Sequence, residues 1–283
     1  MAKKFTPEEK IAYQKELREF NQQLTGKKAV IGKLEKEMKD DSYDLANYYL
    51  IAIANEHLES VYINCLKSKA CEQYLKKRND DFLNDARKIY FKALIELEKI
   101  VGNFVDTALH ENQDILKTMT RMNPKRILNL INKLKNSLNE ILASYGENNK
   151  YKWSFVDMEG RFVTIFRNFL DYKKLSVNDP RDPYFPENTQ LLNMIKVFLQ
   201  QVSQRFREKY LIATKEVVDI KAAINFQEAL RKITSLLGPQ EDAELCKKTI
   251  DSWKQMLEKE EKIKEAKAKE ASKKKTRAKA KSK

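Results

Sequence analysis

Residues 80–101 read DDFLNDARKIYFKALIELEKIV, and this stretch decides the fold class of the chain. Its apolar side chains recur at spacings of three and four, which is the period of an α-helix with one buried face. The same spacing continues as far as Ile115 with one longer step. We therefore predict one long helix over residues 80–121, eased at Gly102.

The composition points to helices throughout. The chain has 283 residues but only six glycines and six prolines, about 2% of each against typical usage of roughly 7% and 5%. Turn-rich β folds and glycine-rich nucleotide-binding folds need more of both residues, and neither a GxxxxGK[ST] nor a GxGxxG motif occurs. Hydrophobic residues, at 42%, suffice for a core.

Local signals mark where the helices begin and end. Thr6, Pro7 and Glu9 form a capping box, Pro124 follows the good cap Asn123, and Gly238 suits a helix end. Three prolines in residues 178–186 predict an extended loop. The predicted helices cover residues 7–40, 43–77, 80–121, 124–144, 153–173, 189–211, 214–237 and 239–270, with Gly26 and Gly32 as points where the first could split.

We expect an all-α fold: an elongated bundle of about eight long helices with a charged C-terminal helical extension and a disordered basic tail. The loops divide it into an N-terminal bundle of residues 1–145, a C-terminal bundle of residues 151–257, and a charged helix and tail of residues 258–283. After Leu257 the apolar stripe stops, and Glu-to-Lys pairs four residues apart can support a solvated helix.

The tail is the clearest functional signal. Residues 266–283 contain nine basic residues and one acid, so they carry +8 of the chain's net +14. Their composition resembles the disordered arms of linker-histone-like proteins. Such a segment binds a polyanion, such as nucleic acid or a ribonucleoprotein, through counterion release and without reading sequence. The residues expected to bind are Lys267, Lys269, Lys273, Lys274, Lys275, Arg277, Lys279, Lys281 and Lys283. A solubilising or targeting tail and contact with an anionic membrane surface are the alternatives.

Two aromatic segments are candidate binding sites. Residues 151–169 interleave aromatic and basic side chains, which could clamp single-stranded nucleic acid. Their phenylalanines share one helical face, however, while Arg161, Arg167 and Asn168 lie largely off it, so we interpret the stripe as core. Tyr184 and Phe185, in the proline-rich loop, are candidate anchors for a protein partner, unless the loop folds them back onto its own domain.

We expect no metal and no cofactor. His57 and His110 have no second histidine or cysteine at a ligand spacing, and the three cysteines form no CxxC pair. An odd number of cysteines fits a reducing compartment. The N-terminus lacks the apolar run of a signal peptide, and no stretch is apolar enough to span a bilayer. These features predict a cytoplasmic protein.

The function we expect is that of a non-enzymatic helical adaptor or scaffold. Its body would contact a protein partner, or another copy of itself, through an apolar helix face, and its tail would bind a polyanion. One alternative is a purely structural, self-associating helical protein of a cytoskeleton or appendage, with a solubilising tail. A second is an enzyme whose site is built from scattered helical residues, which would show a buried polar pocket.

Overall fold

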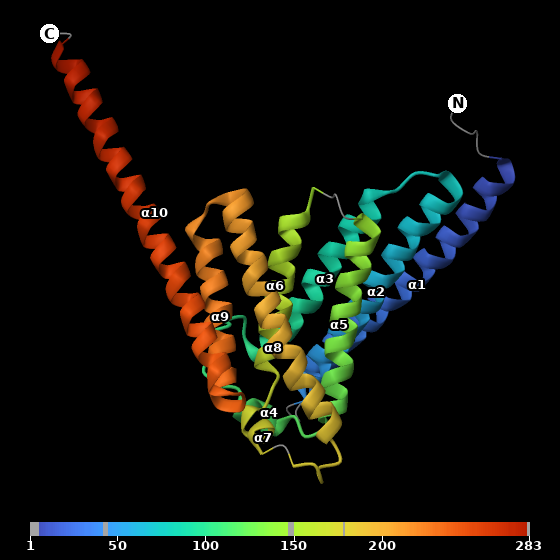
Figure 1. Ribbon diagram of the computed structural model, residues 1–283. Coiled ribbons are helices and arrows are strands. Elements are labelled where there is room, and N and C mark those ends of the chain that lie inside the picture. The colour runs from blue at the N-terminus through green and yellow to red at the C-terminus, as the bar shows by residue number, and fades with distance from the viewer. Residues whose placement is uncertain (1–5, 42–44, 147–149, 178, 282–283) are drawn as a thin grey trace. The chain divides into compact units, whose positions relative to one another are not determined.

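The computed structural model describes the backbone of residues 6–41, 45–146, 150–177 and 179–281. It describes their side chains except those of residue 261 and residues 263–283. The chain forms two compact units, Met1–Ile195 and Lys196–Lys283. All the regular secondary structure of the described residues is helical, which confirms the predicted all-α class (Figure 1).

The first unit contains seven complete helices. They are α1 (Pro7–Asp40), α2 (Ala46–Leu75), α3 (Asp80–Val101), α4 (Gln113–Thr118), α5 (Pro124–Tyr145), α6 (Lys152–Asn168) and α7 (Tyr172–Ser176). Helix α8 (Phe185–Glu208) runs across the division between the units, and the second unit continues with a π-helical segment η1 (Lys209–Thr214), α9 (Val217–Leu237) and α10 (Gln240–Lys281).

The predicted helix starts are confirmed where a local cap defines them. Thr6 and Glu9 form both halves of the capping box at the start of α1. Asn123 accepts a hydrogen bond from the Arg126 N–H at the start of α5, and Gly238 caps the end of α9. Gly26 does not split α1, which runs unbroken to Asp40.

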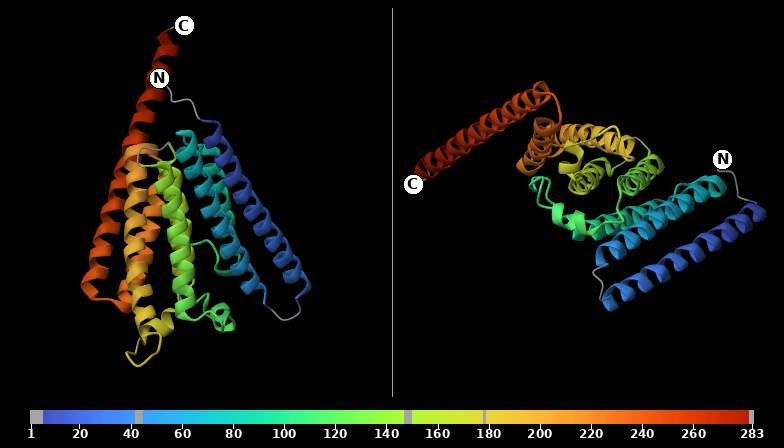
Figure 2. Two further views of the ribbon diagram at one scale, coloured as in Figure 1. Left: turned by 90° about the vertical axis from the view of Figure 1, so that its right-hand side faces the viewer. Right: turned by 90° about the horizontal axis from the view of Figure 1, so that it is seen from below.

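Helices α1, α2 and α3 lie side by side, and α5 packs against both α2 and α3 (Figures 1 and 2). Because α2 has neighbours on several sides, it is apolar around most of its circumference, and its buried side chains include Ile53, Leu58 and Val61. Helix α3 buries the apolar face that its sequence predicted, with Ala86 and Leu97 fully covered.

The predicted helix over residues 80–121 is wrong at its C-terminal end. Helix α3 stops at Val101, and Gly102 adopts φ 77° and ψ 172°, a conformation that is essentially restricted to glycine. An irregular segment and the short α4 follow. The apolar spacing continued past Gly102 by coincidence, and Phe104 is in fact 68% exposed.

The side chains of Arg167 and Asn168 correct a second expectation. We placed them off the buried face of their helix, yet they are 1% and 3% exposed. Asn168 donates to the carbonyls of Val101 and Phe104, and Arg167 donates to that of Thr107. They are buried because the irregular segment after α3 needs hydrogen-bond donors for its backbone carbonyls. The phenylalanine stripe of α6 is core, as predicted.

The predicted loop over residues 178–186 is shorter than expected. Helix α8 begins at Phe185, so Pro186 lies in its first turn. Backbone N–H groups in a first turn have no acceptor within the helix, so the missing N–H of a proline costs no hydrogen bond there. The predicted helix over residues 153–173 is also interrupted, because α6 ends at Asn168 and the short α7 begins at Tyr172.

The second unit is built around the pairing of α9 with α10. Beside them, the ammonium group of Lys209 in η1 lies 2.9 Å from Oδ1 of Asp219 in α9, and the two side chains are only 12% and 5% exposed. The Thr214 hydroxyl donates to the other oxygen of Asp219. This buried ion pair joins the π-helical segment to α9.

The backbone of α10 is helical to Lys281, beyond residue 270 where we expected the helix to end. The side chains of residues 263–283 lie outside the described part of the chain, so the behaviour predicted for the basic tail stays a prediction. The predicted division at residues 145–151 also stays a prediction, although α5 and α6 contact each other within one compact unit.

Candidate binding groove between α1, α2 and α5

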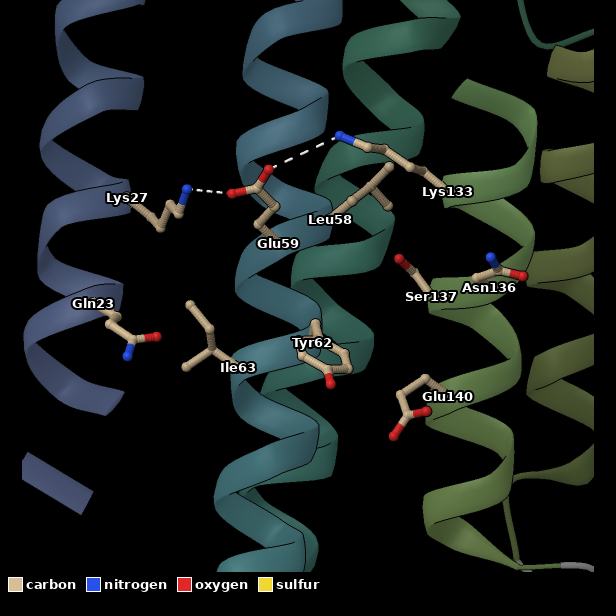
Figure 3. Close-up of a pocket in the computed structure, with 10 residues that line it drawn as sticks. All are labelled: Gln23, Lys27, Leu58, Glu59, Tyr62, Ile63, Lys133, Asn136, Ser137 and Glu140. Carbon is tan, nitrogen blue, oxygen red and sulfur yellow. Dashed lines mark hydrogen bonds and ion pairs between the residues drawn. The ribbon is translucent and has the colours of Figure 1, made fainter. Parts of the chain in front are cut away.

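Helix α2 is central to the first unit, yet it leaves one strip of its surface open. Helices α1 and α5 flank it on two sides, so the strip forms the floor of a groove with those helices as walls (Figure 3). Tyr62, in this strip, is 53% exposed, although most of its neighbours in α2 are buried. The groove has a volume of about 510 Å³.

The floor is apolar and the walls are polar. Leu58 and Ile63 line the floor on either side of Tyr62. Gln23 of α1 and Ser137 of α5 face the groove from its walls. A tyrosine ring that is open to solvent beside buried aliphatic side chains can contribute strongly to the free energy of binding when a partner covers it.

An ion-pair network crosses the groove through Glu59. The Lys27 ammonium of α1 hydrogen-bonds to the Glu59 carboxylate and lies 3.0 Å from Oε2 of Glu56, which raises the pKa of Lys27. On the other side, the Lys133 ammonium of α5 lies 3.9 Å from Oε1 of Glu59. Such exposed pairs contribute only about 0–1 kcal/mol each. Their effect is to connect both walls to the floor.

The remaining carboxylate of the groove is also paired. Glu140 of α5 forms an ion pair with Lys69 of α2, which raises the pKa of that lysine. Lys27 and Lys133 balance Glu59 and Glu140, so the groove has no net charge. The arrangement favours an apolar ligand that has a few polar groups at its edge.

The described residues contain no group of three or more histidine, cysteine, aspartate or glutamate side chains placed to hold a metal ion. Cys65 of α2 is buried, and burial raises the pKa of its thiol to about 12.

The structure places the predicted partner anchors outside this groove. Tyr184 is half-buried, and its hydroxyl accepts a hydrogen bond of 3.2 Å from the Asn123 side-chain amide at the start of α5. Phe185, also half-buried, is the first residue of α8. The fold therefore brings this segment back onto its own unit, which was the alternative reading of the loop.

The predicted polyanion-binding residues lie on the C-terminal part of α10. The backbone is described to Lys281, whereas the side chains from Lys267 to Lys281 and the whole of Lys283 lie outside the described residues. The described residues that line the groove all belong to helices of the first unit.

Sequence reasoning missed the groove residues. The one available signal was the set of polar residues that interrupt the apolar run of α2, among them Asn55, Glu56 and Glu59. Two of these carry the contacts just described, because Glu56 and Glu59 both pair with Lys27. A single sequence gives no means of knowing that α1 and α5 would stand on either side of them.

The fold and the groove define an all-α protein with a concave surface whose lining residues carry no net charge. The chain belongs to the TP0443 family, whose family model matches residues 9–261. That span contains every residue of the groove and ends before the basic segment. No curated protein and no solved structure matches the chain. Among the described residues, no helix combines the length and apolar character that crossing a membrane requires.

Proposed function

We propose that this protein is a non-enzymatic, cytoplasmic helical adaptor. Its body binds a protein partner in the groove between α1, α2 and α5, and residues 266–283 bind a polyanion, such as nucleic acid or a ribonucleoprotein, without sequence specificity. The free, buried cysteines support a reducing compartment. The groove, with its exposed tyrosine and paired charges, supports the binding of a protein.

The uneven distribution of charge along the chain supports the proposed binding of a polyanion. Residues 266–283 hold +8 of the net +14 in under a tenth of the chain. The family match ends at residue 261. Binding through the tail is therefore proposed for this chain, and binding in the groove for the body that the family shares.

Removal of residues 266–283 tests the proposed binding of a polyanion. In the chain without residues 266–283, the remaining residues should keep their helical fold and the melting temperature should be unchanged, but the chain should lose most of its retention of duplex DNA and single-stranded RNA in a gel-shift assay. A chain in which the order of these residues is shuffled is the matched control, and it should bind as well as the native chain because only charge is read. Equal retention by the truncated chain would refute the proposal.

The salt dependence provides a second measurement. If the tail supplies the affinity, the logarithm of the association constant should fall linearly with the logarithm of the salt concentration. The expected slope is about 0.9 per duplex phosphate contacted and about 0.7 per single-strand phosphate. A flat response would place the binding in the body and not in the tail.

A further inference from the structure

A second hollow lies next to the groove, further along the same two helices. It has a volume of about 390 Å³ and lies between α2 and α5. Tyr48, Ile51 and Ala52 of α2 form one side, and Leu130 of α5 is on the other. Lys133 lines both hollows, so they meet at this residue.

The contacts between α2 and α5 show that the two hollows follow one line. Lys133 of α5 donates to Asn55 of α2 at 3.2 Å, and Glu140 pairs with Lys69 further along both helices. The two helices therefore run in the same direction, as Figure 1 also shows. Between Tyr48 and Tyr62, α2 makes about four turns, or about 21 Å at 1.5 Å per residue. The two hollows thus lie end to end along the same pair of helices with Lys133 between them, and we call them together the α2–α5 channel.

One end of this channel is cationic. The Arg121 guanidinium lies over the Tyr48 ring, 5.7 Å from its centroid, and Arg126 donates to the Arg121 carbonyl at 3.0 Å. Both arginines are exposed, and within the described part of the chain neither forms an ion pair with a carboxylate. At the Tyr62 end, in contrast, Glu59 and Glu140 are neutralised by lysines.

We infer that the α2–α5 channel binds one amphipathic α-helix of a partner protein. The helix would be about four turns long, with apolar residues facing Tyr62 and Ala52 and with carboxylates at the end near Arg121 and Arg126. The inference rests on the proposed function, in that the body binds a protein. It adds the secondary structure and the charge of the bound segment.

Three features favour this occupant. The length of the channel matches that of a helix recognised through residues at spacings of three, four and seven. The apolar residues at these spacings on the bound helix can pack against the half-buried floor and the exposed tyrosine of the channel. The charge at the Arg126 end attracts acids and disfavours a second copy of this chain, which carries a net charge of +14.

A selection experiment tests the inference on the full-length chain. The probe is a display library of helices of about sixteen residues, with Leu or Phe at spacings of three and four and random polar positions. Peptides are selected on the native chain, and their affinities are measured by fluorescence anisotropy. We expect acids to be enriched at one end. Ala52→Trp, which fills the channel, and Tyr62→Ala should each lower the affinity by about tenfold.

A charge reversal tests the polarity of the channel. Arg126→Glu should weaken the selected peptides by about tenfold and should strengthen versions in which the terminal acids are replaced by lysines. Lys125→Glu is the matched control, because it makes the same change at the adjacent exposed residue of α5, outside the channel, and it should change the affinity by less than about twofold. Circular dichroism checks that each variant is folded.

The outcomes separate this inference from the proposed function. Peptides that bind Ala52→Trp and Tyr62→Ala as well as the native chain, or that show no acidic end, would overturn the inference. So would self-association of the native chain that Ala52→Trp abolishes, because the occupant would then be a second copy. Gel-shift retention of nucleic acid should be unchanged in all four variants. The inference that the channel binds a helix and the proposal that the tail binds a polyanion can therefore be refuted independently.

Discussion

The side-chain amide of Asn168 donates a hydrogen bond of 3.1 Å to the carbonyl of Val101, the last residue of α3. The two residues are 67 positions apart in the sequence. Asn168 also donates to Phe104, and the Asn112 side chain donates to Val101 and Asn168. The end of α3 is thus held by α6, and the irregular segment that follows is anchored from within the core.

The first prediction concerns Asn168. Asn168→Leu should lower the free energy of unfolding by about 1–3 kcal/mol, because the buried carbonyl of Val101 and the part-buried carbonyl of Phe104 would each lose a donor. Asn139→Leu, at an exposed position of α5, is the control and should change it by less than about 0.5 kcal/mol. Urea denaturation measures both. Equal effects would show that the Asn168 hydrogen bonds do not stabilise this end of α3.

The second prediction contrasts two glycines. Gly102→Ala should cost about 1–3 kcal/mol, since a Cβ disfavours the positive φ of that residue although the surrounding space is open. Gly26→Ala, in the middle of α1 and equally open, should gain about 0.5–1 kcal/mol. Thermal unfolding should therefore move in opposite directions for the two variants, and a shift of both in one direction would contradict the backbone description.

The third prediction is a dependence on pH. Burial, together with Lys92, lowers the pKa of His57 below its ordinary value of 6.5. The unfolded chain therefore takes up a proton at this residue more readily, and stability present above pH 6.5 is lost as the pH falls through the folded-state pKa. His57→Gln should lose less stability than the native chain between pH 7.5 and 5. Parallel stability curves would exclude this contribution.

The fourth prediction concerns the thiols. Cys65, Cys71 and Cys246 are free and buried, and burial raises the pKa of Cys65 to about 12 and raises that of Cys246 as well. Because the thiolate is the reactive form, maleimide labelling of the native chain at pH 8 should be slow. The same chain in denaturant should take up three labels. Rapid, complete labelling of the folded protein would mean that these sites open easily.

The fifth prediction concerns the buried pair in the second unit. Asp219→Ala should destabilise the protein by about 3–5 kcal/mol, because it leaves the Lys209 ammonium buried without its carboxylate. The double variant Lys209→Met with Asp219→Leu should recover most of that loss, because it removes both charges. Chemical denaturation compares them, and a double variant as unstable as the single one would indicate that packing, not charge, sets the cost.

Local signals in the sequence predicted the starts of several helices. Thr6 and Asn123 each cap a helix by accepting a hydrogen bond from the backbone N–H three residues further along the chain. Such contacts need no distant partner, so they can be recognised from a few residues. The same holds for the apolar face of α3, because its period is set by the helix itself.

Features that depend on distant contacts could not be predicted in this way. The apolar spacing continued beyond Gly102, but donors from α6 favour the end of the helix there. Burial of Arg167 was missed for the same reason, since its helix period placed it off the core while the carbonyl of Thr107 required a donor. The loop before α8 is shorter than its three prolines predict, because Pro186 belongs to the first turn of the helix, where proline is tolerated as well as in a loop.

The sequence by itself determined that this protein is helical, where many of its helices begin, and that its positive charge is concentrated in residues 266–283. These properties follow from spacing, caps and composition, which act over a few residues. Only the tertiary structure decided that Tyr62 is left exposed between α1 and α5, and that Glu59 pairs with lysines on both sides. A helix period shows which face is apolar, whereas the neighbours that cover or leave open that face are set by packing over the whole unit.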